Sequence, residues 1–376
     1  MNIGIVDADL LDGGTRHPNL ALMKISKYYK SKNHTVNLLH NYTTLDKYDK
    51  VFMSKVFDFT KIPVSISGNV EYGGTGFYFD DAPELKYEIE HHMPDYSLYD
   101  DYIEKEISRG INKTYFLDYL NYSIGFTTRG CFRGCEFCVN RKCKKVVRHS
   151  HVKEFVDLSR KYIYLWDDNI LGYENWKEVF QELKEIDKPF QFRQGLDIRL
   201  MTDEKASVLS KAKYKGDFIF AFDNIDETNE IIDKIKLWKK YYTAKGNSKF
   251  YVFCGFDRQG IYDYNFWKQD IIDTFERIRI LMTYGCIPYV MRHENYMNSP
   301  FKGMYITLAR WCNQPSFFKK ESLKEYVYIT DGIGRETKQY ASKNYIEEFQ
   351  RQFSDIANEY YDMKFEYLSK LSTIQV

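Results

Sequence analysis

Three cysteines in one short segment are the residues of this chain best suited to chemistry. Cys131, Cys135 and Cys138 are separated by three and then two residues in the run CFRGCEFC. Thiolates at this spacing can each bond a different iron of one cluster. Three protein ligands for four irons leave one iron open, and an open iron can bind a substrate. The spacing therefore predicts a [4Fe–4S] cluster with a free coordination position.

A structural zinc site is the alternative for the same thiols. Such a site takes four ligands, typically thiolates paired at two-residue spacing, and Cys143 could supply the fourth. The other cysteines, at 254, 286 and 312, stand alone beside apolar or aromatic residues, which favours buried thiols. Seven cysteines clustered in this way indicate metal binding in a reducing compartment, not a disulfide framework.

The cysteine run resembles the defining motif of the radical S-adenosylmethionine (SAM) superfamily, Cys-x3-Cys-x2-Cys after the first strand of a barrel. The likeness covers residues 117–300 and extends to Phe137, which the resemblance places near the adenine of SAM. It implies that SAM chelates the open iron. It also implies that an electron, from a reductase such as flavodoxin or ferredoxin, cleaves SAM to methionine and a 5′-deoxyadenosyl radical.

Polar side chains follow the next three predicted strands and complete the candidate site. From the resemblance and from their chemistry, we expect Asp168, Asp197 and Arg199 to be catalytic, and Phe137, Asp167, Asn169, Gln194 and Asp223 to bind the cofactor. Alternatives stay open for two groups. Residues 167–169 are also typical of a helix N-cap, and Asp197 with Arg199 of a local salt bridge.

Six apolar runs, most of them followed by a helical pattern, would position these side chains. They span residues 123–127, 162–166, 190–195, 218–222, 250–253 and 286–291. Repeats of this kind predict a parallel sheet curled into a partial (β/α)6 barrel, with its chemistry at the carboxyl ends of the strands. The predicted fold is α/β. A doubly wound, Rossmann-like domain (residues 1–115) precedes the barrel (116–300), and a helical cap follows it (301–376).

The N-terminal domain resembles the cobalamin-binding domain of B12-dependent radical SAM proteins. The likeness rests on residues 7–13, 54–56 and 73–74, but Asp9 stands where the fingerprint Asp-x-His-x-x-Gly has its cobalt-ligating histidine. Two interpretations stay open: cobalamin bound without this ligand, or a former cobalamin fold reused for substrate binding, which we favour. Residues 1–130 contain no cysteine, which excludes the methylthiotransferases with a second cluster there.

The charge balance gives no global attraction to nucleic acid or membrane, because 54 Lys and Arg face 53 Asp and Glu. The sequence has neither a signal peptide nor a run of 18 apolar residues, so we expect a cytoplasmic protein. Residues 139–153 are basic without an acid, which suits a phosphate-bearing substrate, an electron-donor protein or a solvated face.

The sequence as a whole predicts a radical SAM enzyme that abstracts hydrogen from an unactivated carbon. One rival is a cobalamin-dependent radical methyltransferase. The other is a non-catalytic zinc- or RNA-binding protein that uses the basic stretch. A small molecule, a peptide and a nucleotide all remain open as substrate.

Overall fold

The computed structural model describes residues 1–243, 248–328 and 335–371, with only the backbone at 335–341 and 370–371. The chain forms two compact units: residues 1–193 with 213–215, and residues 194–212 with 216–376. Both are built from helices and mainly parallel strands, which confirms the predicted α/β class. Within the described ranges, no helix has the length and apolar character needed to cross a bilayer.

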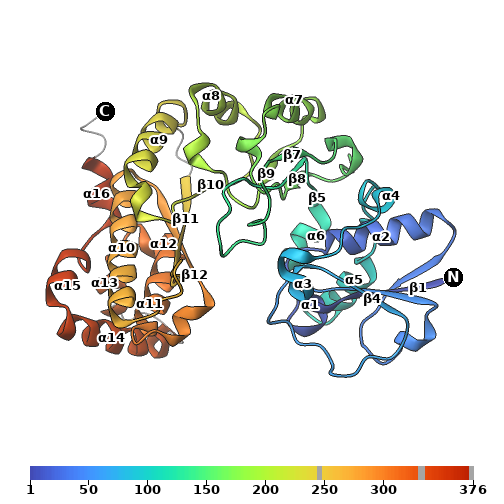
Figure 1. Ribbon diagram of the computed structural model, residues 1–376, viewed down its shortest axis with the longest axis horizontal. Coiled ribbons are helices and arrows are strands. Elements are labelled where there is room, and N and C mark those ends of the chain that lie inside the picture. Colours follow the sequence, from blue (N-terminus) through green and yellow to red (C-terminus); the bar gives the residue numbers. More distant parts are fainter. Residues whose placement is uncertain (244–247, 329–334, 372–376) are drawn as a thin grey trace. The chain divides into compact units, whose positions relative to one another are not determined.

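The N-terminal sheet of the first unit has four parallel strands in the order β2-β1-β3-β4. They are β1 (Asn2–Asp7), β2 (Thr35–Leu38), β3 (Lys50–Ser54) and β4 (Val70–Gly73). Helices α2 (Leu20–Ser31) and α5 (Asp100–Ser108) pack with α6 (Leu117–Asn121) in the core on one face (Figure 1). The core of the other face is filled from loops and from the short helix α3 (Thr75–Tyr78), so the expected second helical layer is reduced.

A second sheet of the first unit carries the cysteine motif and residues 167–169. It consists of parallel strands β5 (Tyr122–Gly125), β8 (Tyr162–Leu165) and β9 (Phe190–Phe192). Helix α7 (Trp176–Ile186) connects β8 to β9, whereas a long loop and the hairpin of β6 (Thr128–Arg129) with β7 (Val147–Arg148) connect β5 to β8. Leu20 of α2 packs against Tyr122, Ile124 and Tyr164, so the N-terminal domain covers part of this sheet.

The second unit holds the other three predicted strands, β10 (Phe218–Ala221), β11 (Ser248–Cys254) and β12 (Ile287–Arg292), as a parallel sheet. Its helices include α8 (Asp203–Lys211), α9 (Thr228–Tyr241), α10 (Tyr264–Thr283) and α11 (Lys302–Cys312), followed by α14 (Arg335–Gln352), α15 (Ser354–Tyr360) and α16 (Phe365–Leu371). All six predicted strands are present, but they are hydrogen-bonded as two sheets of three in different units. A barrel of all six stays a prediction.

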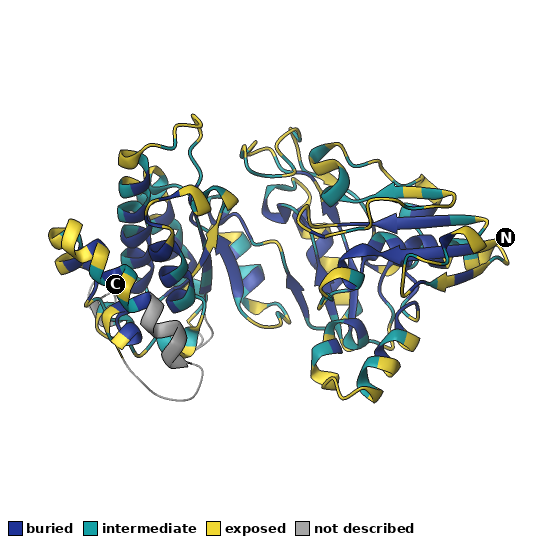
Figure 2. Cartoon of the chain, turned by 90° about the horizontal axis from the view of Figure 1, so that it is seen from below, coloured by how far each residue is buried: buried dark blue, intermediate teal, exposed yellow. Residues whose placement is uncertain are grey.

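The three isolated cysteines are buried, as predicted. Cys254, Cys286 and Cys312 lie in the interior of the second unit, and burial raises the pKa of each thiol, for Cys286 to about 11. In Figure 2, buried residues follow the strands and the inner faces of the helices. These cysteines therefore pack as core residues.

Glu90 of the N-terminal domain pairs with the buried Lys24 of the same domain and also contacts His149, which follows the β6–β7 hairpin. Lys24 is 3% exposed, and its Nζ lies 2.7 Å from Glu90 of α4 (Tyr87–Glu90). His149, which directly follows β7, places its Nε2 3.2 Å from the same carboxylate. Burial opposes ionisation of Glu90, but the contacts with His149 and Lys24 lower its pKa to about 2.

We predict that Glu90→Gln lowers the free energy of unfolding by about 3 kcal/mol, because it leaves the buried ammonium of Lys24 without its carboxylate. Urea denaturation at pH 7 measures this loss. The double variant Lys24→Met with Glu90→Gln should recover much of it, since both charges are then absent. A double variant as unstable as the single one would contradict this explanation.

Candidate functional site: the cysteine loop

Residues 130–146, here named the cysteine loop, form a loop after β5 whose two ends lie side by side. The antiparallel pairs Thr128–Arg148 and Arg129–Val147 close its base. Gly130 adopts φ +92°, and a Cβ at this position would lie 2.4 Å from the carbonyl oxygen of Lys145. The two arms of the loop can therefore approach each other only because residue 130 is glycine.

The three cysteines of the motif are free thiols, and all are partly exposed. A turn brings the last two together, since the Cys138 amide donates to the Cys135 carbonyl over 3.0 Å. The Asn140 amide donates to Cys138 Sγ over 3.4 Å. Burial raises the pKa of Cys138, and the neighbouring Cys135 and Cys131 raise it further. The three sulfurs thus share one electrostatic neighbourhood.

A cluster and a single ion make different demands on these thiols. Among the described residues, no group of three or more His, Cys, Asp or Glu side chains is placed to hold one metal ion. In an iron–sulfur cluster each thiolate binds its own iron. The donor set of three thiols on one loop has the chemistry that such a cluster requires.

Asp167, directly after β8, binds the carboxyl end of β5. The backbone amides of Thr127 and Thr128 donate to its carboxylate over 3.1 and 2.6 Å, and their hydroxyls over 2.5 and 2.7 Å. Asp167 is 1% exposed. Burial raises its pKa, while these four hydrogen bonds favour the ionised form. Asp167 therefore joins the two strands on which the cysteine loop stands.

Asp168 binds both arms of the cysteine loop. One carboxylate oxygen accepts from the Gly130 amide over 2.7 Å, and the other from Asn140 Nδ2 over 2.8 Å. Arg129 Nε lies 3.5 Å from the same side chain. Asp168 therefore binds the loop at the residue before the first cysteine of the motif and at the second residue after its last cysteine.

Asn169 contacts the motif itself. Its Nδ2 donates to Cys131 Sγ over 3.4 Å, and its Oδ1 is buried with no hydrogen-bond partner. The N-cap alternative does not hold for this run, because Asn169 precedes the turn η5 (Ile170–Gly172) without a side-chain cap. Asp168 and Asn169 thus contact the cysteine loop itself, and Asp167 holds the segment from which the loop begins. A role of Asp167, Asp168 or Asn169 in binding or catalysis stays a prediction.

Acids distant in the sequence neutralise much of the basic stretch. Arg141 Nε lies 2.6 Å from Asp80, and Lys142 Nζ lies 2.6 Å from Asp81. Arg148 binds Glu182 over 2.6 Å. These pairs attach the loop to the segment after β4 and to α7. Much of the charge in this stretch therefore serves intramolecular pairing, while Lys144 and Lys145 are exposed.

The remaining predicted site residues lie in the second unit, except Phe137, which is partly buried in the cysteine loop. Arg199 Nε lies 2.7 Å from Asp197, and its Nη1 lies 2.5 Å from Glu227, so the predicted local salt bridge exists and extends to a third residue. These carboxylates raise the pKa of Arg199 against the effect of burial. Gln194 is exposed in the segment after β9. The cofactor and catalytic roles of these residues stay predictions.

Asp223 is a partly buried acid that lies two residues after β10. Its carboxylate accepts from the Phe253 amide over 3.2 Å, and Arg277 Nη1 donates to its backbone carbonyl over 2.8 Å. Burial raises its pKa from 3.8 to about 6, although the charge of Arg277 acts in the opposite direction. Burial therefore favours the protonated form of Asp223 in the folded protein.

Asp9 occupies the position of the cobalt-ligating histidine in the fingerprint, and its carboxylate is already engaged. It accepts from the amides of Val56 and Phe57 over 2.7 and 3.3 Å, and from the hydroxyl of Thr60 over 2.5 Å. The side chain is 5% exposed. Asp9 thus fixes the loop after β3, and it does not fit the part of an axial ligand.

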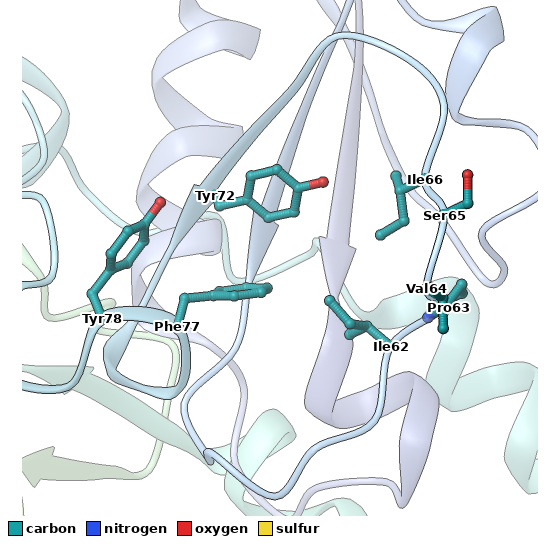
Figure 3. Close-up of a pocket in the computed structure, with 8 residues that line it drawn as sticks. All are labelled: Ile62, Pro63, Val64, Ser65, Ile66, Tyr72, Phe77 and Tyr78. Atoms are coloured by element: carbon teal, nitrogen blue, oxygen red, sulfur yellow. The ribbon is translucent and has the colours of Figure 1, made fainter.

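A pocket of about 580 Å³ lies beside the edge strand β4 of the N-terminal sheet. Figure 3 shows Tyr72 and Phe77 facing Ile62 and Ile66 across it. The lining is mainly apolar and aromatic: Ile62, Pro63, Val64, Ser65, Ile66, Tyr72, Phe77 and Tyr78. The pocket suits an apolar group, and none of the cysteine-loop residues lines it.

Comparison with known proteins gives a distant structural likeness. No family model and no curated protein matches the chain. A similar solved structure is that of the cobalamin-dependent S-adenosylmethionine radical enzyme OxsB with aqua-cobalamin and S-adenosylmethionine bound, at 13% identity and a TM-score of 0.35. The match covers 97% of this chain and 57% of that one, so the chain spans little more than half the length of OxsB. At this TM-score the likeness adds nothing to what the residues support.

We predict that Asp168→Ala loosens the cysteine loop locally, because the Gly130 amide and Asn140 Nδ2 both lose a charged acceptor. Loss of about 1.5 kcal/mol should make the amides of residues 130–142 exchange with deuterium about tenfold faster. Hydrogen-exchange mass spectrometry measures this. The control Glu136→Ala removes an exposed acid from the same loop and should leave exchange unchanged. Equal exchange in the two variants would contradict the anchoring role of Asp168.

We predict a pH-dependent stability that Asp223→Asn removes. The folded protein holds the proton of Asp223 more tightly than the unfolded chain does, because its pKa is about 6 when folded and 3.8 otherwise. The charged form therefore costs stability at neutral pH, and this cost falls as the pH drops through 6 towards 4. Between pH 7.5 and 4.5 the wild type should gain about 2 kcal/mol relative to Asp223→Asn in urea denaturation. Parallel pH profiles would show that Asp223 does not titrate in this way.

Proposed function

We propose that this protein is a radical SAM enzyme whose Cys131, Cys135 and Cys138 hold a [4Fe–4S] cluster. The observation that carries the proposal is the anchoring of these thiols. They lie on a glycine-closed loop at the carboxyl end of β5, and Asp168 and Asn169 at the end of β8 hold this loop by both arms. A thiol set fixed in this way suits a resident cluster with one open iron.

One buried acceptor supports the fit of an amino-acid group beside the cluster. Asn169 Oδ1 lacks a partner although the residue is 3% exposed, and a buried acceptor of this kind calls for a donor from a ligand. The ammonium group of SAM is such a donor. When bound, the cluster and SAM supply one-electron cleavage to methionine and a 5′-deoxyadenosyl radical, which abstracts hydrogen from an unactivated carbon of the substrate.

The residues of the chain have distinct parts in this proposal. Asp167 and Asp168 hold the loop that presents the thiols, and Asn169 accepts from the ammonium group. Phe137 is proposed to face the adenine. We also propose that the six strands form a partial barrel. Cofactor or substrate roles are proposed for Gln194, Asp197, Arg199 and Asp223.

The electron is proposed to come from a small acidic reductase such as flavodoxin or ferredoxin. Lys144 and Lys145, which are exposed at the end of the cysteine loop, support this partner by charge. Cobalamin has no step in the proposed function, because Asp9 is engaged by the loop after β3.

The proposal predicts about four irons per chain and formation of 5′-deoxyadenosine. The protein is purified without oxygen, reconstituted with iron and sulfide, and incubated with SAM and dithionite; the product is measured by mass spectrometry. Cys135→Ala should abolish cluster and product together, because one of three iron ligands is absent. Cys143→Ala is the matched control and should keep both.

Other results would reject the proposal in recognisable ways. One zinc per chain, lost in both cysteine variants, would indicate a four-thiolate structural site. A cluster that never cleaves SAM would exclude the radical chemistry. Retention of RNA by a colourless protein, weakening as salt increases, would favour the non-catalytic binding protein.

A further inference from the structure

The contact between Asn169 and Cys131 is a hydrogen bond to a sulfur that the proposed function makes a cluster ligand. Asn169 Nδ2 lies 3.4 Å from Cys131 Sγ, and the Asn169 carbonyl accepts from the Gly172 amide over 2.9 Å. A Cβ on Gly172 would lie 2.7 Å from the ring of Phe132 and 3.5 Å from Asn169 Cγ. This close packing confines the amide beside the sulfur.

The amide orientation follows from the chemistry of a bound thiolate. A cysteine sulfur that ligates iron has no proton and can only accept. Turning the amide over would place Oδ1 against this sulfur, so that two acceptors would face each other. Only the observed orientation, with Nδ2 towards Cys131 Sγ, satisfies a ligated sulfur.

We propose that Asn169 sets the reduction potential of the cluster through this N–H···S hydrogen bond. The inference rests on the proposed function and deepens it. Reduction adds an electron whose charge is shared by the ligand sulfurs, so a donor at Cys131 stabilises the reduced cluster more than the oxidised one. Hydrogen bonds to the sulfurs are among the factors that set such potentials. Asn169 is thus a positioning and tuning residue that raises the potential.

A second hydrogen bond to the motif cannot be removed by changing a side chain. The Asn140 backbone amide donates to Cys138 Sγ over 3.4 Å, and it remains in variants of residue 169. Asp168, beside Asn169, is held by Gly130 and Asn140 and keeps its charge in the same place. Changes at residue 169 therefore alter one hydrogen-bond donor to the cysteine sulfurs, while the Asn140 amide and the charge of Asp168 stay in place.

The test is a redox titration of the reconstituted cluster, followed by electron paramagnetic resonance without SAM or substrate. Asn169→Leu removes the donor at similar size, and we expect the reduced-to-oxidised ratio at fixed solution potential to fall about tenfold. This equals a midpoint about 59 mV more negative for one electron. Asn169→Asp keeps the shape, removes the donor and adds a negative charge, so its midpoint should be lower still. Asn175→Leu, at an exposed position before α7, should match the wild type.

The outcomes separate this inference from the function on which it rests. The order wild type, Asn169→Leu, Asn169→Asp, from highest to lowest potential, supports the tuning role. If Asn169→Leu assembles no cluster, the isosteric Asn169→Asp decides the question alone. Midpoints equal to that of the wild type, with iron content unchanged, would overturn the role of Asn169 only. A wild-type protein that binds no iron would overturn the proposed function itself.

Discussion

The cysteine loop depends on a single buried carboxylate at the end of β8. Asp167 accepts four hydrogen bonds from Thr127 and Thr128, and so fastens the ends of two parallel strands to each other. The loop begins directly after this junction, and the next two residues, Asp168 and Asn169, reach its arms and its first sulfur. These bonds extend the pairing of β5 with β8 to the residues directly before the loop. A buried carboxyl group without a cationic partner is tolerated inside because its oxygens are satisfied by hydrogen-bond donors.

Much of the fold could be predicted from the sequence, because apolar runs and helical periodicity are local properties. The six predicted strands and helix α7 lie where the patterns indicated, whereas the short strands β6 and β7 were not predicted. The pairing of strands is not local. Nothing in the runs 190–195 and 218–222 shows that β9 and β10 belong to different sheets and different units. The loops that cover one face of the N-terminal sheet could not be predicted either, because loops have no hydrophobic periodicity.

The sequence identified candidate site residues, but it did not show which residues hold them in place. The spacing of Cys131, Cys135 and Cys138 identified the loop, and the strand-end rule identified residues 167–169. Their hydrogen-bond partners could not be predicted, because Thr127, Gly130 and Asn140 approach them only when two parallel strands lie side by side. For the same reason, the basic stretch seemed to lack acids: Asp80 and Asp81 precede it by some 60 positions yet pair with it in the fold. The amino-acid composition of this stretch therefore does not distinguish the paired Arg141 from the exposed Lys144 and Lys145.

The packing of Leu20 on Tyr122, Ile124 and Tyr164 has a consequence for how the chain can be divided. A boundary at residue 115 appears natural in the sequence, yet a truncated protein that begins there would expose three apolar side chains on one face of β5 and β8. It would also lack Asp80 and Asp81, the partners of Arg141 and Lys142. An exposed apolar surface would then lie next to a loop with unpaired positive charge. Such a fragment would be prone to aggregation. The N-terminal domain therefore covers apolar surface of the cysteine-bearing sheet, and the two belong in one expressed polypeptide.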